Sequence, residues 1–97
     1  MSWFVYIVRC SDNSLYTGIT TNVERRINEH NTKIGAKSLY GKLPVQLVYI
    51  EKGLDKKIAG NREREIKGWR KEKKEELVKN LGLVVFNKKR PSDRESK

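Results

Sequence analysis

The chain has 97 residues, with 22 Lys and Arg against 12 Asp and Glu, which gives a formal net charge of +10. This length fits one small domain, and the charge predicts a polyanionic partner, nucleic acid before an anionic membrane surface; a basic surface kept for solubility is the alternative. A single cysteine, Cys10, excludes a disulfide framework and a thiolate zinc site. No apolar run is long enough for a membrane helix, and Met1–Trp3 lacks the basic flank of a signal peptide. We therefore expect a reducing, cytoplasmic setting without membrane contact.

The first two predicted elements are strands. Trp3–Arg9 and Leu15–Ile19 are rich in aromatic and β-branched residues, and the polar segment Ser11–Ser14 between them is typical of a turn. The sequence therefore predicts a β-hairpin. Because side chains alternate between the two faces of a strand, Tyr6 and Tyr16 share a face if the register allows it.

The next predicted element is a helix that begins after Asn22. The Asn22 side chain is a good cap for the first backbone N–H groups of a helix. Val23 and Ile27 form an apolar stripe, and at about 100° per residue Arg26 and His30 fall together at its edge. At this edge, we expect the two side chains to pack partly against the core and still to reach a bound ligand.

A basic loop and a third strand are predicted next. Residues 35–44 carry Lys37 and Lys42 and are expected to form the loop. Residues 45–50 alternate in polarity, which predicts a strand with Val45, Leu47 and Tyr49 on one face.

A second helix is predicted from its cap Asp55 to about Trp69. Its expected buried stripe consists of Ile58, Ile66 and Trp69, with Ala59 beside them. Two acidic residues on this helix are expected to point in different directions around the helix axis. Glu63 projects near one margin of the stripe, whereas Glu65 points roughly 160° away from it around the helix. Only Glu63 is therefore expected to face a site shared with the hairpin.

A third, highly charged helix is predicted over residues 71–81, with Gly82 as its C-terminal stop and with three inward side chains, those of Leu77, Val78 and Leu81. The apolar residues 83–86 are expected to pack back or to add an edge strand. The polar end, residues 87–97, is typical of disorder. We therefore predict one domain over residues 1–82 and a largely disordered tail over residues 83–97.

The order and spacing of several of these residues resemble the GIY-YIG nuclease superfamily, and most of all its small, stand-alone members. The resemblance covers roughly residues 3–80 and is carried by Leu15–Thr21, Val23–Arg26, Gly35–Lys37 and Glu63–Lys67. Phe4-Val5-Tyr6 stands in place of Gly-Ile-Tyr, and Thr17 in place of Ile, but both motif tyrosines are present.

The resemblance implies an α+β fold, a three-stranded antiparallel sheet flanked by helices. It also implies an enzyme that hydrolyses nucleic-acid phosphodiester bonds with Mg²⁺ or Mn²⁺. By position, five residues match the family's catalytic set, namely Tyr6, Tyr16, Arg26, His30 and Glu63, and Glu63 is the metal ligand. One carboxylate suffices for an ion that keeps most of its waters, and the planar Arg26 fork suits phosphoryl charge. Which tyrosine accepts the proton of the attacking water stays open.

Four further basic residues are expected to bind the nucleic-acid backbone: Arg25, Lys37, Lys42 and Lys67. The predicted function is DNA cleavage by a monomer in repair or recombination, on branched, flapped or damaged DNA. The alternative is a binding module that keeps the nuclease fold without catalysis. Taken singly, Tyr6 and Tyr16 would be sheet aromatics, His30 a structural histidine, and Glu63 half of an i,i+4 ion pair with Lys67.

Overall fold

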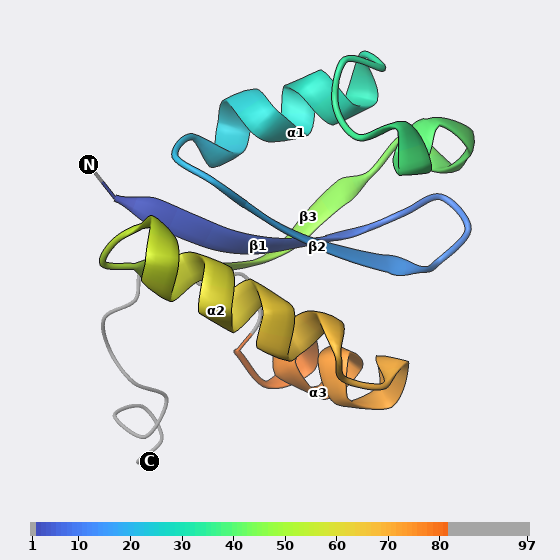
Figure 1. The fold of residues 1–97 in the computed structure, drawn as a ribbon. Coiled ribbons are helices and arrows are strands. Elements are labelled where there is room, and N and C mark those ends of the chain that lie inside the picture. Colours follow the sequence, from blue (N-terminus) through green and yellow to red (C-terminus); the bar gives the residue numbers. More distant parts are fainter. Residues whose placement is uncertain (1, 82–97) are drawn as a thin grey trace.

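A computed structural model describes residues 2–81 of the chain. The elements follow in the order β1 (Trp3–Arg9), β2 (Leu15–Thr20), α1 (Val23–Asn31), the 3-10 helix η1 (Lys37–Lys42), β3 (Gln46–Gly53), α2 (Lys56–Lys67) and α3 (Lys71–Leu81). The strands form one antiparallel sheet in the order β2-β1-β3, which makes β2 an edge strand. Figure 1 shows α1 on one face of the sheet, with α2 and α3 on the other. The predicted α+β fold is confirmed.

The hairpin has the register that the site requires. Tyr6 lies opposite Gly18 and Val8 lies opposite Tyr16, so Tyr6 and Tyr16 are diagonal neighbours on one face. The turn between the strands contains Asn13 at a φ of 74°, a left-handed conformation that Asn tolerates better than most residues. The shared face that the sequence allowed for is thereby confirmed.

Both predicted helix caps are present. The Asn22 side chain accepts a hydrogen bond from the backbone N–H of Arg25, and the Asp55 side chain accepts one from that of Ile58, each over 2.9 Å. The second helix ends at Lys67, earlier than predicted, because the backbone N–H of Gly68 closes onto carbonyls of the last turn.

Two clusters of buried side chains lie on opposite faces of the sheet. The cluster beneath α2 and α3 contains Val5, Ile7, Tyr49, Ala59 and Ile66. The cluster beneath α1 and η1 contains Tyr6, Val8, Cys10, Leu39 and Val45. Alternate residues of β1 therefore enter opposite cores, as expected for a central strand that is covered on both faces.

The third strand departs from the prediction. It begins at Gln46 rather than Val45 and extends to Gly53. Its pairing with β1 shifts by one residue, because Ile7 lies opposite Tyr49 while Val8 lies opposite Leu47. This bulge interrupts the alternation, so Leu47 packs on the α1 side and Tyr49 on the α2 side. The prediction that Val45, Leu47 and Tyr49 share one face is therefore wrong for Tyr49, whereas Val45 and Leu47 do pack on the same side.

The second helix also turns a different residue toward the sheet. Ile58 was predicted to be buried but is 44% exposed, whereas its neighbour Ala59 is fully buried. The helix approaches β3 closely here, since a Cβ on Gly53 would lie only 3.2 Å from that of Ala59. Only a small side chain fits this contact, so the larger one points outward. Ile66 is buried as predicted, and Trp69 packs half-buried beside it.

The segment predicted to be a basic loop contains η1, because Leu39 is buried and anchors it to the α1-side core. The third helix has its predicted bounds, and Leu77 and Val78 pack inward. Predictions for the Leu81 side chain and for residues 82–97 lie outside the described residues. Within residues 2–81, no helix is long and apolar enough to cross a membrane.

Candidate active site

The two tyrosines meet over the glycine of the edge strand. The Tyr6 ring lies across Gly18, where a Cβ would come within 2.5 Å of the Tyr6 hydroxyl. Gly18 therefore makes the space into which that hydroxyl projects. The Tyr16 ring lies beside it, with 6.4 Å between the two ring centroids. Tyr6 is buried, whereas Tyr16 is only half-buried.

His30 of α1 completes this aromatic group. Its Nε2 atom lies 2.8 Å from the Tyr6 hydroxyl oxygen, and its ring is 5.6 Å from that of Tyr16. The backbone N–H of Ala36 donates to Nδ1 over 3.3 Å. Because Nδ1 accepts this bond, the neutral ring carries its proton on Nε2, which donates to Tyr6. His30 lies deeper than the predicted edge position, since it is only 1% exposed.

The segment after α1 is shaped to fit against this histidine. A Cβ on Gly35 would overlap the His30 ring. Gly35 and Ala36 therefore supply a close backbone surface and one hydrogen bond to the imidazole. The sequence pattern includes Gly35 and Ala36 only as part of a motif. The signal for their role is a glycine five residues after His30, where a side chain would collide with the imidazole.

Arg26 is the cation of the group, one helical turn before His30. Its guanidinium donates to the Glu29 carboxylate over 3.0 Å and lies near the Tyr6 hydroxyl. Burial raises the pKa of Tyr6 to about 12, although Arg26 pulls it in the other direction. Burial lowers the pKa of His30, and the charge of Arg26 lowers it further. At neutral pH the site therefore holds a protonated phenol, a neutral imidazole and a guanidinium.

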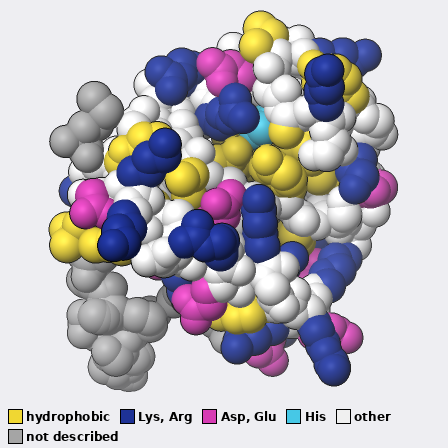
Figure 2. Space-filling model, in the orientation of Figure 1, with side chains coloured by type: hydrophobic (Ala, Val, Ile, Leu, Met, Phe, Trp, Pro, Cys, Tyr) yellow, Lys and Arg dark blue, Asp and Glu magenta, His cyan; other side chains and the backbone are white. Residues whose placement is uncertain are grey.

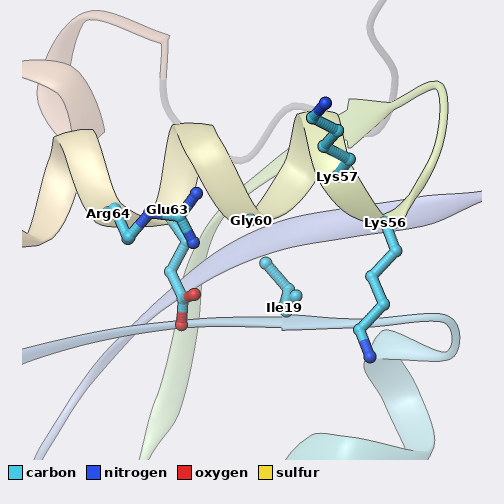
Figure 3. Close-up of a pocket in the computed structure, with 6 residues that line it drawn as sticks. All are labelled: Ile19, Lys56, Lys57, Gly60, Glu63 and Arg64. Atoms are coloured by element: carbon cyan, nitrogen blue, oxygen red, sulfur yellow. The ribbon is translucent and has the colours of Figure 1, made fainter.

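Glu63 reaches the same edge of the sheet from the opposite layer. Figure 3 shows its carboxylate extending from α2 toward the neighbouring strands. Its side chain is 19% exposed and pairs with Lys67 over 3.2 Å, so the i,i+4 ion pair is present. The Lys67 ammonium also lies 5.9 Å from the centroid of the Tyr16 ring. The charge of Glu63 contributes to the raised pKa of Tyr6, so Glu63 lies within electrostatic reach of that tyrosine.

The second acid on this helix behaves as predicted. Glu65 is 56% exposed and pairs with Arg62 over 3.0 Å, away from the tyrosines. Arg62 in turn binds Glu51, whose carboxylate accepts a bond from Tyr49 over 2.5 Å. This second network ties α2 to β3 and serves the fold.

The residues present fit a divalent cation of the magnesium type. Glu63 offers a hard carboxylate oxygen whose charge acts on Tyr6, and ions of this type bind through one or two carboxylates, waters and substrate phosphates. Among residues 2–81, no group of three or more His, Cys, Asp or Glu side chains could hold a metal ion.

The basic residues predicted to bind nucleic acid lie at different distances from this site. Arg25 shares Glu29 with Arg26, and Lys67 adjoins Tyr16. Lys37 directly follows Ala36 on η1, whereas Lys42 lies beside the hairpin turn, where its charge acts on Asp12. Figure 2 shows Lys and Arg side chains around the region where the histidine, acidic and hydrophobic side chains are visible. The face around the candidate site is therefore strongly basic.

Comparison with known proteins identifies the family. A profile described as the GIY-YIG catalytic domain matches residues 2–76. The chain belongs to the GIY-YIG family. GIY-YIG domains form a nuclease superfamily, and this member is similar to small proteins named UPF0213. One of Haloquadratum walsbyi is 55% identical over 75 residues, which cover 77% of this chain and 84% of that protein.

Other relatives agree with this assignment. The UPF0213 protein YhbQ of Escherichia coli is 46% identical over 76 residues, covering 78% of this chain and 76% of that protein. A solution NMR structure of a UPF0213 protein from Bacillus halodurans is similar with a TM-score of 0.54 and 43% identity, and the match covers 81% of this chain and 84% of that one. The GIY-YIG fold of this chain therefore has an experimental counterpart.

Proposed function

We propose that this GIY-YIG protein is a divalent-metal-dependent endonuclease that hydrolyses phosphodiester bonds of DNA. One observation carries the proposal. Tyr6, Tyr16, Arg26 and His30 converge over Gly18 at the edge of the sheet, and Glu63 reaches that edge from the other layer. A structural role alone does not require a carboxylate, a guanidinium and two phenols to meet on so basic a surface.

Arg26 is proposed to stabilise the negative charge that grows on the phosphoryl oxygens during cleavage. Its guanidinium keeps its proton at any physiological pH and presents a planar pair of donors. Glu29 holds one side of that guanidinium over 3.0 Å, which orients it before substrate binds. Preorganised donors of this kind stabilise a transition state without further rearrangement.

His30 is proposed to orient Tyr6 rather than to take its proton. Its Nε2–H group donates to the Tyr6 oxygen, so the phenolic proton of Tyr6 points elsewhere. The site then offers two phenolic oxygens near the attacking water, those of Tyr6 and Tyr16. Tyr16 is the more accessible of the two. The general base is the tyrosine whose replacement by Phe causes the larger loss of cleavage rate.

Glu63 is proposed to hold Mg²⁺ or Mn²⁺ together with waters and substrate phosphate. When bound, such an ion neutralises phosphoryl charge and lowers the pKa of bound water. Lys67 pairs with Glu63 over 3.2 Å and is half-exposed. Its ammonium is therefore free to turn to a phosphate when the carboxylate takes another partner. We propose further that the protein acts as a monomer in DNA repair or recombination.

The test is a cleavage assay on single-stranded, duplex, flap and junction DNA, with RNA counterparts, in Mg²⁺, in Mn²⁺ and in chelator. We expect cut DNA in either metal and none in chelator. A double variant, Arg26→Ala with Glu63→Gln, serves as the control for contaminating nuclease. Salt-sensitive DNA binding without cleavage of any substrate would contradict the proposal and favour the non-catalytic binding module.

A further inference from the structure

A shallow groove leads along α2 from the candidate active site. It lies between this helix and the edge strand β2, and Figure 3 shows the residues that line it: Ile19, Lys56, Lys57, Gly60, Glu63 and Arg64. The five residues from α2 recur at helical spacing and so occupy one face of the helix. Glu63 stands toward the C-terminal end of this face, one turn before Lys67 and the Tyr16 ring.

The basic residues of this groove differ from the others on the helix in their partners. Arg62 pairs with Glu51 and Glu65, and Lys67 pairs with Glu63. Within residues 2–81, Lys56, Lys57 and Arg64 form no ion pair with an acidic side chain. Three basic side chains therefore line the groove without an ion pair to a described carboxylate. The Lys56 ammonium lies 5.3 Å from the centroid of the Trp3 ring, Arg64 donates to Asn61, and Figure 3 shows the Lys57 ammonium turned away from Ile19.

Several residues on this face of α2 are unfavourable for the stability of the helix. Lys56 and Lys57 occupy the first turn, where the helix dipole favours acidic residues, and that turn contains none. Gly60 lies inside the helix, where glycine is unfavourable. Packing does not require it, because a Cβ there would meet nothing nearer than Arg64 Nη1 at 3.7 Å. Local disadvantages gathered on one surface point to a function for that surface.

We propose that this groove binds the backbone phosphates of the nucleic-acid strand on one side of the scissile bond, an inference that rests on the proposed nuclease function. Lys56, Lys57 and Arg64 contact the phosphates, and the positive end of the α2 dipole adds to their field. Ile19 and the bare backbone at Gly60 form a floor that a sugar can approach closely.

The dimensions agree with this occupant. Lys56 and Glu63 are seven residues apart, about 10 Å along a helix at about 1.5 Å per residue. A nucleic-acid strand advances about 3.4 Å per nucleotide along a duplex axis, so the groove spans about three nucleotides. The cleavage site at Glu63 and the phosphate groove thus follow one continuous strand path.

The test measures binding of a labelled DNA strand and its duplex to the full chain by fluorescence anisotropy, in chelator, over a range of salt concentrations. Lys57→Ala with Arg64→Ala should weaken binding on the order of tenfold and reduce the slope of log affinity against log salt by about 1.5. The matched control is Lys52→Ala with Lys79→Ala, which removes the same charge from exposed positions on β3 and α3. The control should keep the wild-type slope.

A second variant separates binding from stability. Gly60→Gln keeps the charge, favours the helix and fills the floor of the groove. We expect a higher melting temperature together with weaker DNA binding, two changes that a purely structural role of Gly60 would not combine. Wild-type affinity in Gly60→Gln would overturn the proposal.

The outcomes also separate this proposal from the nuclease function. Equal losses of affinity in the two double variants would overturn the groove while leaving metal-dependent cleavage intact. Wild-type protein that binds no DNA, or binds it without salt dependence, would instead overturn the proposed function and the groove together.

Discussion

Replacement of Glu63 by Gln is the most direct test of the candidate metal ligand. Gln is nearly isosteric with Glu but lacks the charge that holds a divalent cation. A metal ion contributes several kcal/mol to the transition state of phosphodiester cleavage. We therefore expect cleavage to fall at least a hundredfold, about 2.7 kcal/mol at 1.36 kcal/mol per factor of ten.

The same substitution should change stability only slightly. Glu63 loses its ion pair with Lys67, an i,i+4 pair in which the lysine side chain is 50% exposed and the glutamate 19%. Pairs of this kind contribute about 0.3–0.5 kcal/mol. In a domain of this size that corresponds to about 1–4 °C in melting temperature. DNA binding in chelator should be equal or tighter, because a negative charge near the phosphates has been removed.

Glu65→Gln is the matched control, since it removes the same charge from the same helix on its exposed side. Single-turnover cleavage in Mg²⁺, thermal melting and DNA binding in chelator should be measured for both variants. Glu65→Gln should cleave like the wild type. Full activity in Glu63→Gln, or a larger loss in Glu65→Gln, would refute the metal-ligand assignment.

Three further predictions concern the residues around Gly18. Arg26→Ala should reduce cleavage on the order of a hundredfold or more while DNA binding and melting persist, and Arg26→Lys should restore little because it lacks the planar fork; wild-type rates in Arg26→Ala would refute its role. Tyr6→Phe should lower the unfolding free energy by about 1–3 kcal/mol in denaturant titrations, because the buried Nε2–H of His30 loses its acceptor. A neutral effect would contradict a stabilising hydrogen bond between Tyr6 and His30. The pKa of His30 is lowered from its usual value of 6.5 in the folded protein, so the unfolded chain takes up a proton first as the pH falls. The unfolding free energy should therefore be highest above pH 6.5 and decline below it. His30→Gln should remove this part of the pH dependence, and an unchanged profile of unfolding free energy against pH would contradict the prediction.

Much of the local structure follows from near neighbours in the chain. Asn22 and Asp55 cap their helices because a short polar side chain reaches the N–H group three residues on. Arg26 and His30 lie together because they are one helical turn apart, and Glu63 and Glu65 diverge for the same reason. Such relations need only the helical period, so the residue pattern predicts them correctly.

Other features depend on contacts between distant segments. The bulge at Val48 separates Leu47 from Tyr49 because β3 must pair with β1, and no periodicity within β3 indicates where one residue will be inserted. Ile58 points outward because Ala59 fits the narrow contact with Gly53. Both outcomes are set by how closely two elements approach, a distance that the hydrophobic pattern of one segment does not contain.

The chemistry of the candidate site combines both kinds of information. The order of the tyrosines, arginine, histidine and glutamate along the chain indicates the family and nominates the residues. Their protonation depends on tertiary contacts, because the backbone of Ala36 selects the His30 tautomer and burial sets the pKa of Tyr6. Burial and hydrogen-bond partners arise only when the hairpin, α1 and the segment after α1 pack together. The sequence therefore predicts which side chains form the candidate site, and the tertiary structure determines their protonation.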